Sequence, residues 1–524
     1  MSNTPYAVEM RGVTKAFGSL VANESVSFSV RTGTIFALVG ENGAGKSTCM
    51  NLLYGLFQPD SGTIHIRGEQ RAWRSPREAI RAGLGMVHQH FMLAGPHSGL
   101  DNIILGDEPE HKGWSFLPRW ARPISRKRAI KDLDDLITKH QIAVNLDQSV
   151  DVMPVGVQQR LEILKLLYRN AGILILDEPT AVLTPHENEA FFASLHHLKE
   201  QGKTIIIITH KLREVLSHAD DLAVLRAGRV VATRPTAGLT EQELAELMVG
   251  RAVQLIAEVP PAPALGPVAL SCQNLSLSSR GSKPRLNNIS FTMRAGEIVG
   301  IAGVEGNGQS ELLELLADPR FYFGHGEGRH RLSASGDLSV LGHDVRSWSA
   351  ARLRDQGVSM VPEDRHRQGL LLDQDLTQNF LLGLAQEPQF NHFGWIRAKA
   401  ATRAVTDAIT EFDIRPKTPS ALAKGLSGGN QQKLVIAREL ARQPKLLICA
   451  QPTRGVDVGA IEFIHQRLLE ARSRGMAVLL ISSSLEEVLA LSDRILVMYE
   501  GHFIGECERG VDEAHLGRLM GGGS

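Results

Sequence analysis

The sequence has few cysteines and no excess of either charge, and each shortage argues against a class of protein. Four of the 524 residues are cysteine, and their scattered positions fit neither a zinc site nor a disulfide framework. Lysine plus arginine and aspartate plus glutamate both number 57, so the formal charge is zero. A neutral chain lacks the long-range attraction that nucleic-acid-binding proteins use. We therefore expect no nucleic-acid partner.

Long hydrophobic runs are also missing. Runs such as Ile173–Leu176 and Ile205–Ile208 are far shorter than the ~20 residues that span a bilayer, and are typical of buried parallel strands. The segment from Met1 to Glu9 has no basic region followed by an apolar core, so it does not resemble a secretion signal. We therefore expect any contact with a membrane to be made through partner proteins.

Glycine, by contrast, is concentrated in one informative segment between a predicted strand at 34–39 and a predicted helix at 46–53. The segment reads Gly40, Glu41, Asn42, Gly43, Ala44, Gly45, Lys46, Ser47 and Thr48. Such a turn directs backbone N–H groups and a helix N-terminus at phosphate. Lys46 is predicted to reach the β- and γ-phosphates, and Ser47 to ligate Mg²⁺. A chance match in a chain with 50 glycines is the alternative.

A second motif makes that alternative less attractive. The apolar run that ends at Leu176 is followed directly by Asp177 and Glu178. Asp177 is predicted to hold Mg²⁺ and Glu178 to polarise an attacking water as general base. A strand that merely ends in a solvated acidic turn is common, but it is a weaker interpretation downstream of a phosphate-binding loop.

The chain contains a second, altered copy of this pattern. Residues 303–310 repeat the glycine-rich segment with Gln309 in the place of Lys46. Between the halves, residues 259–267 contain four prolines, which favour an extended spacer. We predict a first domain at 1–255, a linker at 256–267 and a second domain at 268–524. Strands that alternate with helices predict a parallel α/β sheet in each.

A third motif suggests a family. The segment Leu426–Gln432, with Ser427, Gly428 and Gly429, resembles the signature motif of ABC ATPases, and the resemblance extends over residues 6–250 and 268–519. It implies an α/β fold with two tandem P-loop NTPase domains of the ABC type. Each would have a parallel-sheet core, a small antiparallel β part and a helical subdomain. It also implies binding of ATP with Mg²⁺.

The resemblance also assigns roles to individual residues. Phe17 would stack on adenine, although an ordinary core phenylalanine is an equally good interpretation. Gln89 would sense Mg²⁺ and the transporter interface, and His210 would contact the γ-phosphate. ABC domains pair head to tail, so Ser427, Gly428, Gly429 and Asp457 of the second half would act on ATP held by the first.

Departures from the family pattern fall in both halves, and head-to-tail pairing sorts them. The altered positions are Gln309, Glu363, Ala450, Gln451 and Ser483 in the second half, and Pro154 and Thr184 in the first. Under this pairing all seven belong to one composite site. The other site, built on Lys46, keeps every group. Two domains that decay independently would not give this partition, so we predict one working ATPase site.

Two segments point to a branch of the family. Residues 86–91 and 451–457 resemble the fused ATPase subunit of bacterial ABC uptake systems for simple sugars and nucleosides, and the turn at 181–185 favours the nucleoside branch. The resemblance implies two transmembrane permease subunits, an extracytoplasmic solute-binding protein, and a peripheral position on the cytoplasmic face of the inner membrane. The sequence does not identify the solute.

Two rival functions belong to other classes. A soluble twin-ATPase translation factor that works on ribosomes usually has two intact sites and a long charged linker, which this chain lacks. A nucleic-acid repair ATPase is disfavoured by the neutral charge and by the scattered cysteines.

Overall fold

A computed structural model describes residues 6–18, 20–88, 92–109, 124–140, 142, 144–180, 185–252, 260, 263–279, 283–304, 306–323 and 332–523. The chain divides into two compact units, Met1–Val253 and Gln254–Ser524.

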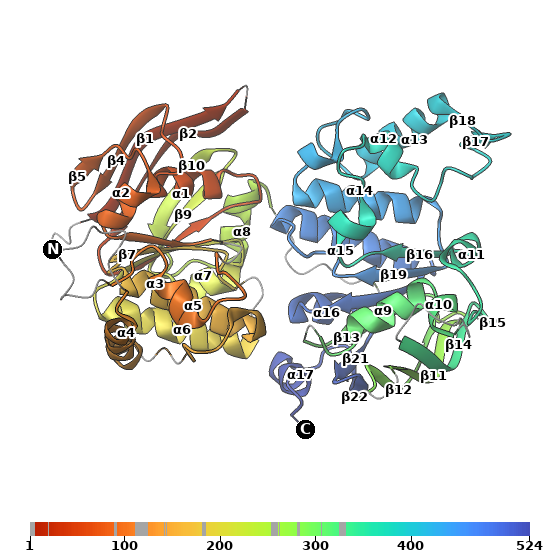
Figure 1. The fold of residues 1–524 in the computed structure, drawn as a ribbon. Helices are drawn as coiled ribbons and strands as arrows, with labels where there is room; N and C mark the ends of the chain where they lie inside the picture. Colours follow the sequence, from red (N-terminus) through yellow and green to blue (C-terminus); the bar gives the residue numbers. More distant parts are fainter. Residues whose placement is uncertain are drawn as a thin grey trace. The chain divides into compact units, whose positions relative to one another are not determined.

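The first unit contains two sheets and a group of helices (Figure 1). Its strands are β1 (Tyr6–Phe17), β2 (Leu20–Arg31), β3 (Ile35–Val39), β4 (Ser61–Ile66), β5 (Glu69–Arg71), β6 (Leu84–Val87), β7 (Ile173–Asp177), β8 (Thr204–Thr209), β9 (Asp221–Arg226) and β10 (Arg229–Pro235). Its helices are α1 (Lys46–Tyr54), α2 (Pro76–Arg81), α3 (Gly99–Ile104), α4 (Arg126–His140), α5 (Val155–Tyr168), α6 (Pro185–Glu200), α7 (Leu212–His218) and α8 (Glu241–Val249).

The larger sheet of this unit has the strand order β10-β9-β3-β8-β7-β6, and all its neighbouring pairs are parallel except β10 with β9. Every residue of β3, β7 and β8 is buried, as expected for strands covered on both faces. The smaller sheet, β2-β1-β4-β5, is antiparallel. Helix α1 shares one hydrophobic core with both sheets through side chains such as Met50 and Leu53. That packing fixes the start of α1, where the phosphate-binding motif lies.

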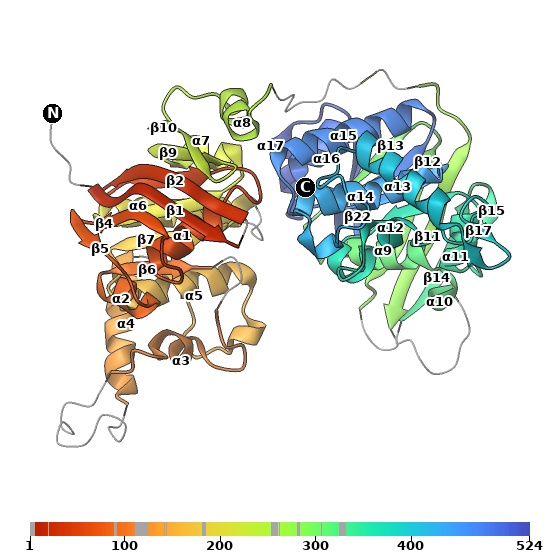
Figure 2. The same cartoon turned by 90° about the horizontal axis from the view of Figure 1, so that it is seen from above.

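Helices α3, α4 and α5 form a separate lobe beside the sheets of the first unit (Figure 2). Their apolar faces meet in a core of their own that includes Leu100, Ile103, Leu133 and Leu161. Helix α4 occupies 126–140, where the spacing of apolar residues predicts an inserted helix.

The second unit repeats this architecture. Its strands are β11 (Val268–Ser279), β12 (Leu286–Arg294), β13 (Ile298–Ala302), β14 (Leu332–Val340), β15 (His343–Asp344), β16 (Val358–Val361), β17 (Asn391–His392), β18 (Trp395–Ile396), β19 (Leu446–Ala450), β20 (Ala477–Ser482), β21 (Arg494–Tyr499) and β22 (His502–Glu508). Its helices are α9 (Gln309–Ala317), α10 (Arg320–Phe323), α11 (Ala350–Asp355), α12 (Leu376–Phe380), α13 (Ala398–Glu411), α14 (Gly428–Ala441), α15 (Val458–Ser473), α16 (Leu485–Leu491) and α17 (Glu513–Met520).

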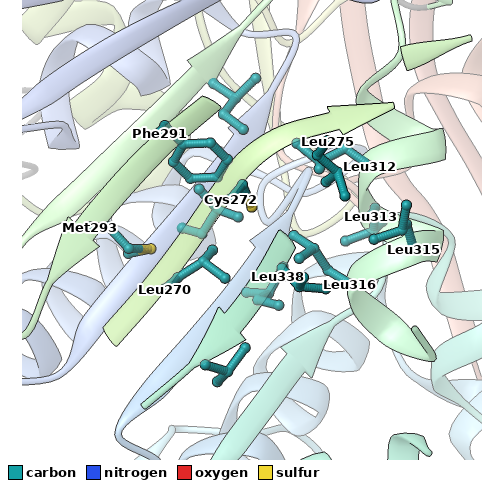
Figure 3. Close-up of a cluster of buried hydrophobic side chains, with 14 of the residues drawn as sticks. Leu270, Cys272, Leu275, Phe291, Met293, Leu312, Leu313, Leu315, Leu316 and Leu338 are labelled. Carbon is teal, nitrogen blue, oxygen red and sulfur yellow. The ribbon is translucent and has the colours of Figure 1, made fainter. Parts of the chain in front are cut away.

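The strand order of its larger sheet, β16-β19-β20-β13-β21-β22, is that of the first unit element for element. Figure 3 shows that Leu312, Leu313, Leu315 and Leu316 of α9, the helix after the second glycine-rich segment, face the antiparallel strands that carry Leu270 and Leu338. The expected α/β fold class, with a mainly parallel sheet and a smaller antiparallel sheet in each of two units, is confirmed. Among the described residues, no helix is both long and apolar enough to cross a membrane.

Candidate nucleotide-binding site

The glycine-rich segment of the first unit forms a tight loop between β3 and α1. Gly40 and Gly45 have φ angles of 157° and 99°. A Cβ atom on Gly40 would lie 2.1 Å from the carbonyl oxygen of Leu225, and one on Gly45 would lie 2.3 Å from that of Ala22. Only glycine fits where the backbone approaches so closely. Glycine at positions 40 and 45 is therefore a packing requirement of this loop.

Lys46 lies inside the loop. Its side chain is only 6% exposed, and Nζ donates hydrogen bonds to the carbonyl oxygens of Gly40 at 2.6 Å and Glu41 at 3.0 Å. The ammonium group is thus held at the first turn of α1, where the N-terminal N–H groups add positive potential. This arrangement suits the phosphates that the sequence predicts as ligands.

A buried residue outside the sequence motifs also holds this loop in place. Asn23 of β2 is fully buried, and its Nδ2 donates to the carbonyl oxygen of Gly45 at 3.2 Å. Sequence reasoning missed Asn23. The one available signal is a polar residue within a strand that otherwise alternates towards the core, and that signal does not name its partner.

The acidic pair lies at the end of β7, next to the loop. Asp177 is 7% exposed, and the Ser47 hydroxyl lies near enough to lower the pKa of its carboxyl group. Burial raises the pKa of Asp177 to about 6, and the charge of Glu178 adds to the effect, while Ser47 and Lys46 oppose it. A buried carboxylate beside a hydroxyl supplies the hard oxygen donors that Mg²⁺ prefers. These residues therefore fit Mg²⁺.

Glu178 is oriented by an unusual backbone conformation and by His210. Its φ angle is 47°, and its N–H donates to the carbonyl oxygen of Ile208 on the next strand at 2.9 Å. Oε1 of Glu178 lies 2.8 Å from Nδ1 of His210, which follows β8. Burial by itself would raise the pKa of Glu178, but the hydrogen bond and charge of His210, with Lys46 and Lys211, lower it below its ordinary value. The carboxylate therefore stays ionised, as a general base must.

The second unit keeps this backbone but not its ionisable groups. Gln451 has a φ angle of 45°, and its N–H donates to the carbonyl oxygen of Ile481 at 2.7 Å. Its Oε1 accepts hydrogen bonds from the N–H and hydroxyl of Ser483, at 3.2 and 3.1 Å. Gln451 and Ser483 thus occupy the positions of Glu178 and His210, and neither can take a proton from water at neutral pH.

The second glycine-rich loop is altered in the same way. Gln309 begins α9 where Lys46 begins α1, and its Nε2 donates to the carbonyl oxygen of Val304 at 3.2 Å. The hydroxyl of Ser310 donates to Oε2 of Glu363 at 2.9 Å, and the buried Ala450 stands where the first unit has Asp177. This loop therefore has no lysine and no aspartate to match those of the first unit.

The signature motif of the second unit is intact and lies beside Asp457. Ser427 caps α14, and its Oγ accepts hydrogen bonds from the N–H and Nδ2 of Asn430, at 3.4 and 2.9 Å. Asp457 caps α15 through the N–H of Ala460 at 2.9 Å. A Cβ atom on Gly429 would lie 2.7 Å from Oδ2 of Asp457. In the first unit Pro154 is the N-cap of α5, and its side chain makes no cap hydrogen bond.

Four predicted residues remain: Phe17, Thr48, Gln89 and Thr184. Phe17 ends β1 and is 43% exposed, with Phe57 edge-on at a centroid distance of 5.2 Å. Thr48 lies in the first turn of α1. Gln89 and Thr184 lie outside the described residues. The structure therefore brings together Lys46, Ser47, Asp177, Glu178 and His210 within the first unit.

Comparison with known proteins agrees with this arrangement. Residues 23–181 and 286–454 both match the family model described as ABC transporter. The chain belongs to this family. It is an ABC transporter ATPase subunit in which the ATP-binding domain occurs twice, as the sequence resemblance implied.

Several curated ABC proteins resemble this one over nearly their whole length. A nucleoside import ATP-binding protein of Lactococcus lactis subsp. cremoris is 42% identical over 518 residues, which are 99% of this chain and 98% of that protein. A guanosine import ATP-binding protein of Bacillus subtilis has the same identity and coverage. A glucose import ATP-binding protein of Haloferax volcanii is 41% identical and covers 100% of this chain and 97% of its own.

Proposed function

We propose that this ABC subunit couples ATP hydrolysis to the uptake of a nucleoside. Relatives of nearly full length are named as ATP-binding proteins for import, two for nucleosides and one for glucose. An ATP-binding subunit of a nucleoside or sugar importer works with permease components. The family resemblance further supports two transmembrane permeases, an extracytoplasmic solute-binding protein and a position on the cytoplasmic face of the inner membrane.

Hydrolysis in this proposal takes place at the loop of the first unit. The observation that carries it is the difference between two aligned pairs: Glu178 with His210 in one unit, and Gln451 with Ser483 in the other. Lys46 binds the β- and γ-phosphates. Glu178 takes a proton from the attacking water on Oε1 or Oε2, while His210 keeps the carboxylate in place.

Ser47, Asp177 and Gln89 are the residues that would hold Mg²⁺. The ion, when bound, supplies positive charge to the phosphate oxygens as negative charge develops on the leaving group. The residues of this chain orient the triphosphate through the N–H groups of 43–48 and separate it from bulk water. Phe17 is proposed to contact the adenine.

Four residues of the second half are proposed to complete the same reaction. Ser427, Gly428 and Gly429 begin α14 with N–H groups that suit a γ-phosphate, and Asp457 begins the neighbouring helix. The altered residues of both halves would then share the other site, which does not hydrolyse ATP. The second unit thus retains what the first needs and has lost what its own loop would use.

Uptake by cells tests the importer function. We expect cells without this protein to lose accumulation of radiolabelled nucleoside, and the wild-type chain to restore it. The chain with Glu178→Gln should be made in equal amount and should not restore uptake. Co-purification separates the alternative: detergent-solubilised permeases support the importer, whereas ribosomes support a translation factor. Normal nucleoside uptake in the deletion strain would contradict the proposal.

A further inference from the structure

A segment that follows β16 is fastened to the signature helix of the second unit, and we call residues 363–369 the strap. At its start, Nη1 and Nη2 of Arg365 donate to the backbone carbonyl oxygens of Arg454 at 2.6 Å and Gly455 at 3.3 Å. Nε of Arg365 donates to Oε1 of Gln431 at 3.4 Å. One guanidinium group therefore joins the strap both to α14 and to the loop that precedes Asp457.

Two further contacts hold the strap against α14. Nε2 of His366 lies 2.8 Å from the same Oε1 of Gln431. At the other end, Nη1 of Arg438 donates to the carbonyl oxygen of Gly369 at 2.8 Å, and Arg438 is only 6% exposed. Gln431 and Arg438 lie about two turns apart on α14. The strap is thus attached to the helix along its length.

The guanidinium group of Arg365 is closely packed against the first turn of α14. A Cβ atom on Gly428 would lie 2.6 Å from the carbonyl oxygen of Gly455 and 2.9 Å from Nη2 of Arg365. The helix start, the guanidinium group and the loop at 454–457 are therefore in direct contact. Because close-packed groups resist separate displacement, we expect these three parts to move as one unit.

The strap also reaches the altered phosphate loop. Glu363, its first residue, accepts a hydrogen bond from the Ser310 hydroxyl at 2.9 Å, and its Oε1 lies 3.8 Å from Nη1 of Arg454. In the first half the aligned sequence has Phe91 where the second has Arg365, and phenylalanine cannot donate these bonds. At this position, therefore, only the second half has an arginine that can make these hydrogen bonds.

We propose that Arg365 is a positioning residue that ties Glu363, the signature residue Ser427 and Asp457 into one rigid piece. A displacement of the strap then shifts Ser427 and Asp457 together. This inference rests on the proposed function, in which those two residues act on ATP held by the first half. It gives the altered half a mechanical role: its strap sets the position of groups that the working site requires.

The test uses the full-length chain with Arg365→Ala and Arg365→Lys. Lysine keeps the charge but cannot reach three acceptors with a planar fork. Arg367→Ala is the matched control, because Arg367 lies in the same strap and is exposed. Hydrogen exchange of the amides at 428–433 and 454–457, binding of a fluorescent ATP analogue and ATP turnover are measured for each.

We expect faster exchange at both stretches in the two Arg365 variants and wild-type exchange in the control. Turnover should fall about tenfold or more in Arg365→Ala, while affinity for the analogue stays within about twofold, because small misplacements near a reacting group reduce rate more than binding. Arg365→Lys should fall between Arg365→Ala and the wild type. Wild-type exchange or wild-type turnover in Arg365→Ala would overturn the inference.

Ser427→Ala separates failure of this inference from failure of the proposed function. If Ser427→Ala turns over ATP at the wild-type rate, the Ser427 hydroxyl does not serve the working site, and the part of the proposed function that places the second half there is wrong. If Ser427→Ala is slow while Arg365→Ala is normal in turnover and exchange, only the role of Arg365 is refuted.

Discussion

Oε1 of Glu178 lies 2.8 Å from Nδ1 of His210, and this contact joins the ends of neighbouring strands β7 and β8. The aligned contact in the other unit joins Gln451 to Ser483, which directly follow β19 and β20. Both Glu178 and Gln451 have a left-handed backbone. The two units therefore build the same turn and place different chemistry on it.

Glu178→Gln should abolish turnover and retain ATP. The amide cannot accept a proton, and general-base catalysis contributes about 10²- to 10⁴-fold to a rate. The glutamine has the size of the glutamate and can keep a hydrogen bond to His210, as Gln451 does with Ser483. Phosphate release and equilibrium ATP binding measure the two effects. Normal phosphate release by the purified variant would refute the role of Glu178.

Restoring both acids of the second unit should not create a second active site. In a chain that carries Glu178→Gln, we expect Ala450→Asp with Gln451→Glu to give no turnover, because Gln309 and Pro154 remain. Ala450 is buried, so the new carboxylate should also lower the melting temperature. A Gln451→Glu single variant is the control for stability. Recovery of turnover in the combined variant would show that the second loop binds ATP productively.

The free energy of unfolding should depend on pH through Asp177 when Mg²⁺ is absent. Its pKa is raised from 3.8 to about 6, so folding favours the protonated form. The resulting stabilisation, about 3 kcal/mol, is complete below about pH 4 and is lost as the pH rises through about 6. Asp177→Asn does not titrate. Relative to wild type it should gain about 1.4 kcal/mol between pH 5 and pH 8 in chelator.

Denaturant unfolding at both pH values, with and without Mg²⁺, checks this expectation. Mg²⁺ should stabilise the wild type at pH 8 and leave Asp177→Asn nearly unchanged, because binding to the folded form alone stabilises it. Asp101, whose pKa is lowered rather than raised, supplies a control: Asp101→Asn should show no gain on going to pH 8. A flat pH dependence of the difference for Asp177→Asn would count against this account.

Gly45→Ala should damage ATP binding far more than its backbone strain alone explains. The new methyl group would meet the carbonyl oxygen of Ala22 at 2.3 Å and displace the loop. Gly33→Ala is the matched control, since Gly33 has a φ angle of 71° and a methyl group added there would meet no described atom within 4 Å. The control should cost about 1 to 2 kcal/mol of stability and bind ATP normally. Titration with a fluorescent ATP analogue and thermal melting distinguish the two; equal affinities would refute the packing argument.

Features set by local sequence were predictable, whereas contacts between distant segments were not. The loop at 40–48, the acidic end of β7 and helix α4 follow from glycine spacing, an apolar run and helical periodicity, all within short windows. Asn23 escaped because nothing local marks its bond to Gly45. The partners of Arg365 escaped for the same reason, since Gln431 and Arg454 come 66 and 89 residues later. The predicted roles of individual site residues, Gln89 among them, stay predictions.

The glutamine that replaces a catalytic acid at position 451 has an energetic consequence for transport. If each closure of the chain hydrolyses one ATP, the number of ATP molecules used per solute molecule is half that of a transporter with two working sites. Every tenfold rise in the concentration ratio of a neutral solute requires about 1.4 kcal/mol. A chain with one working site can therefore maintain a less steep solute gradient than a transporter with two, if both move the same number of solute molecules per closure.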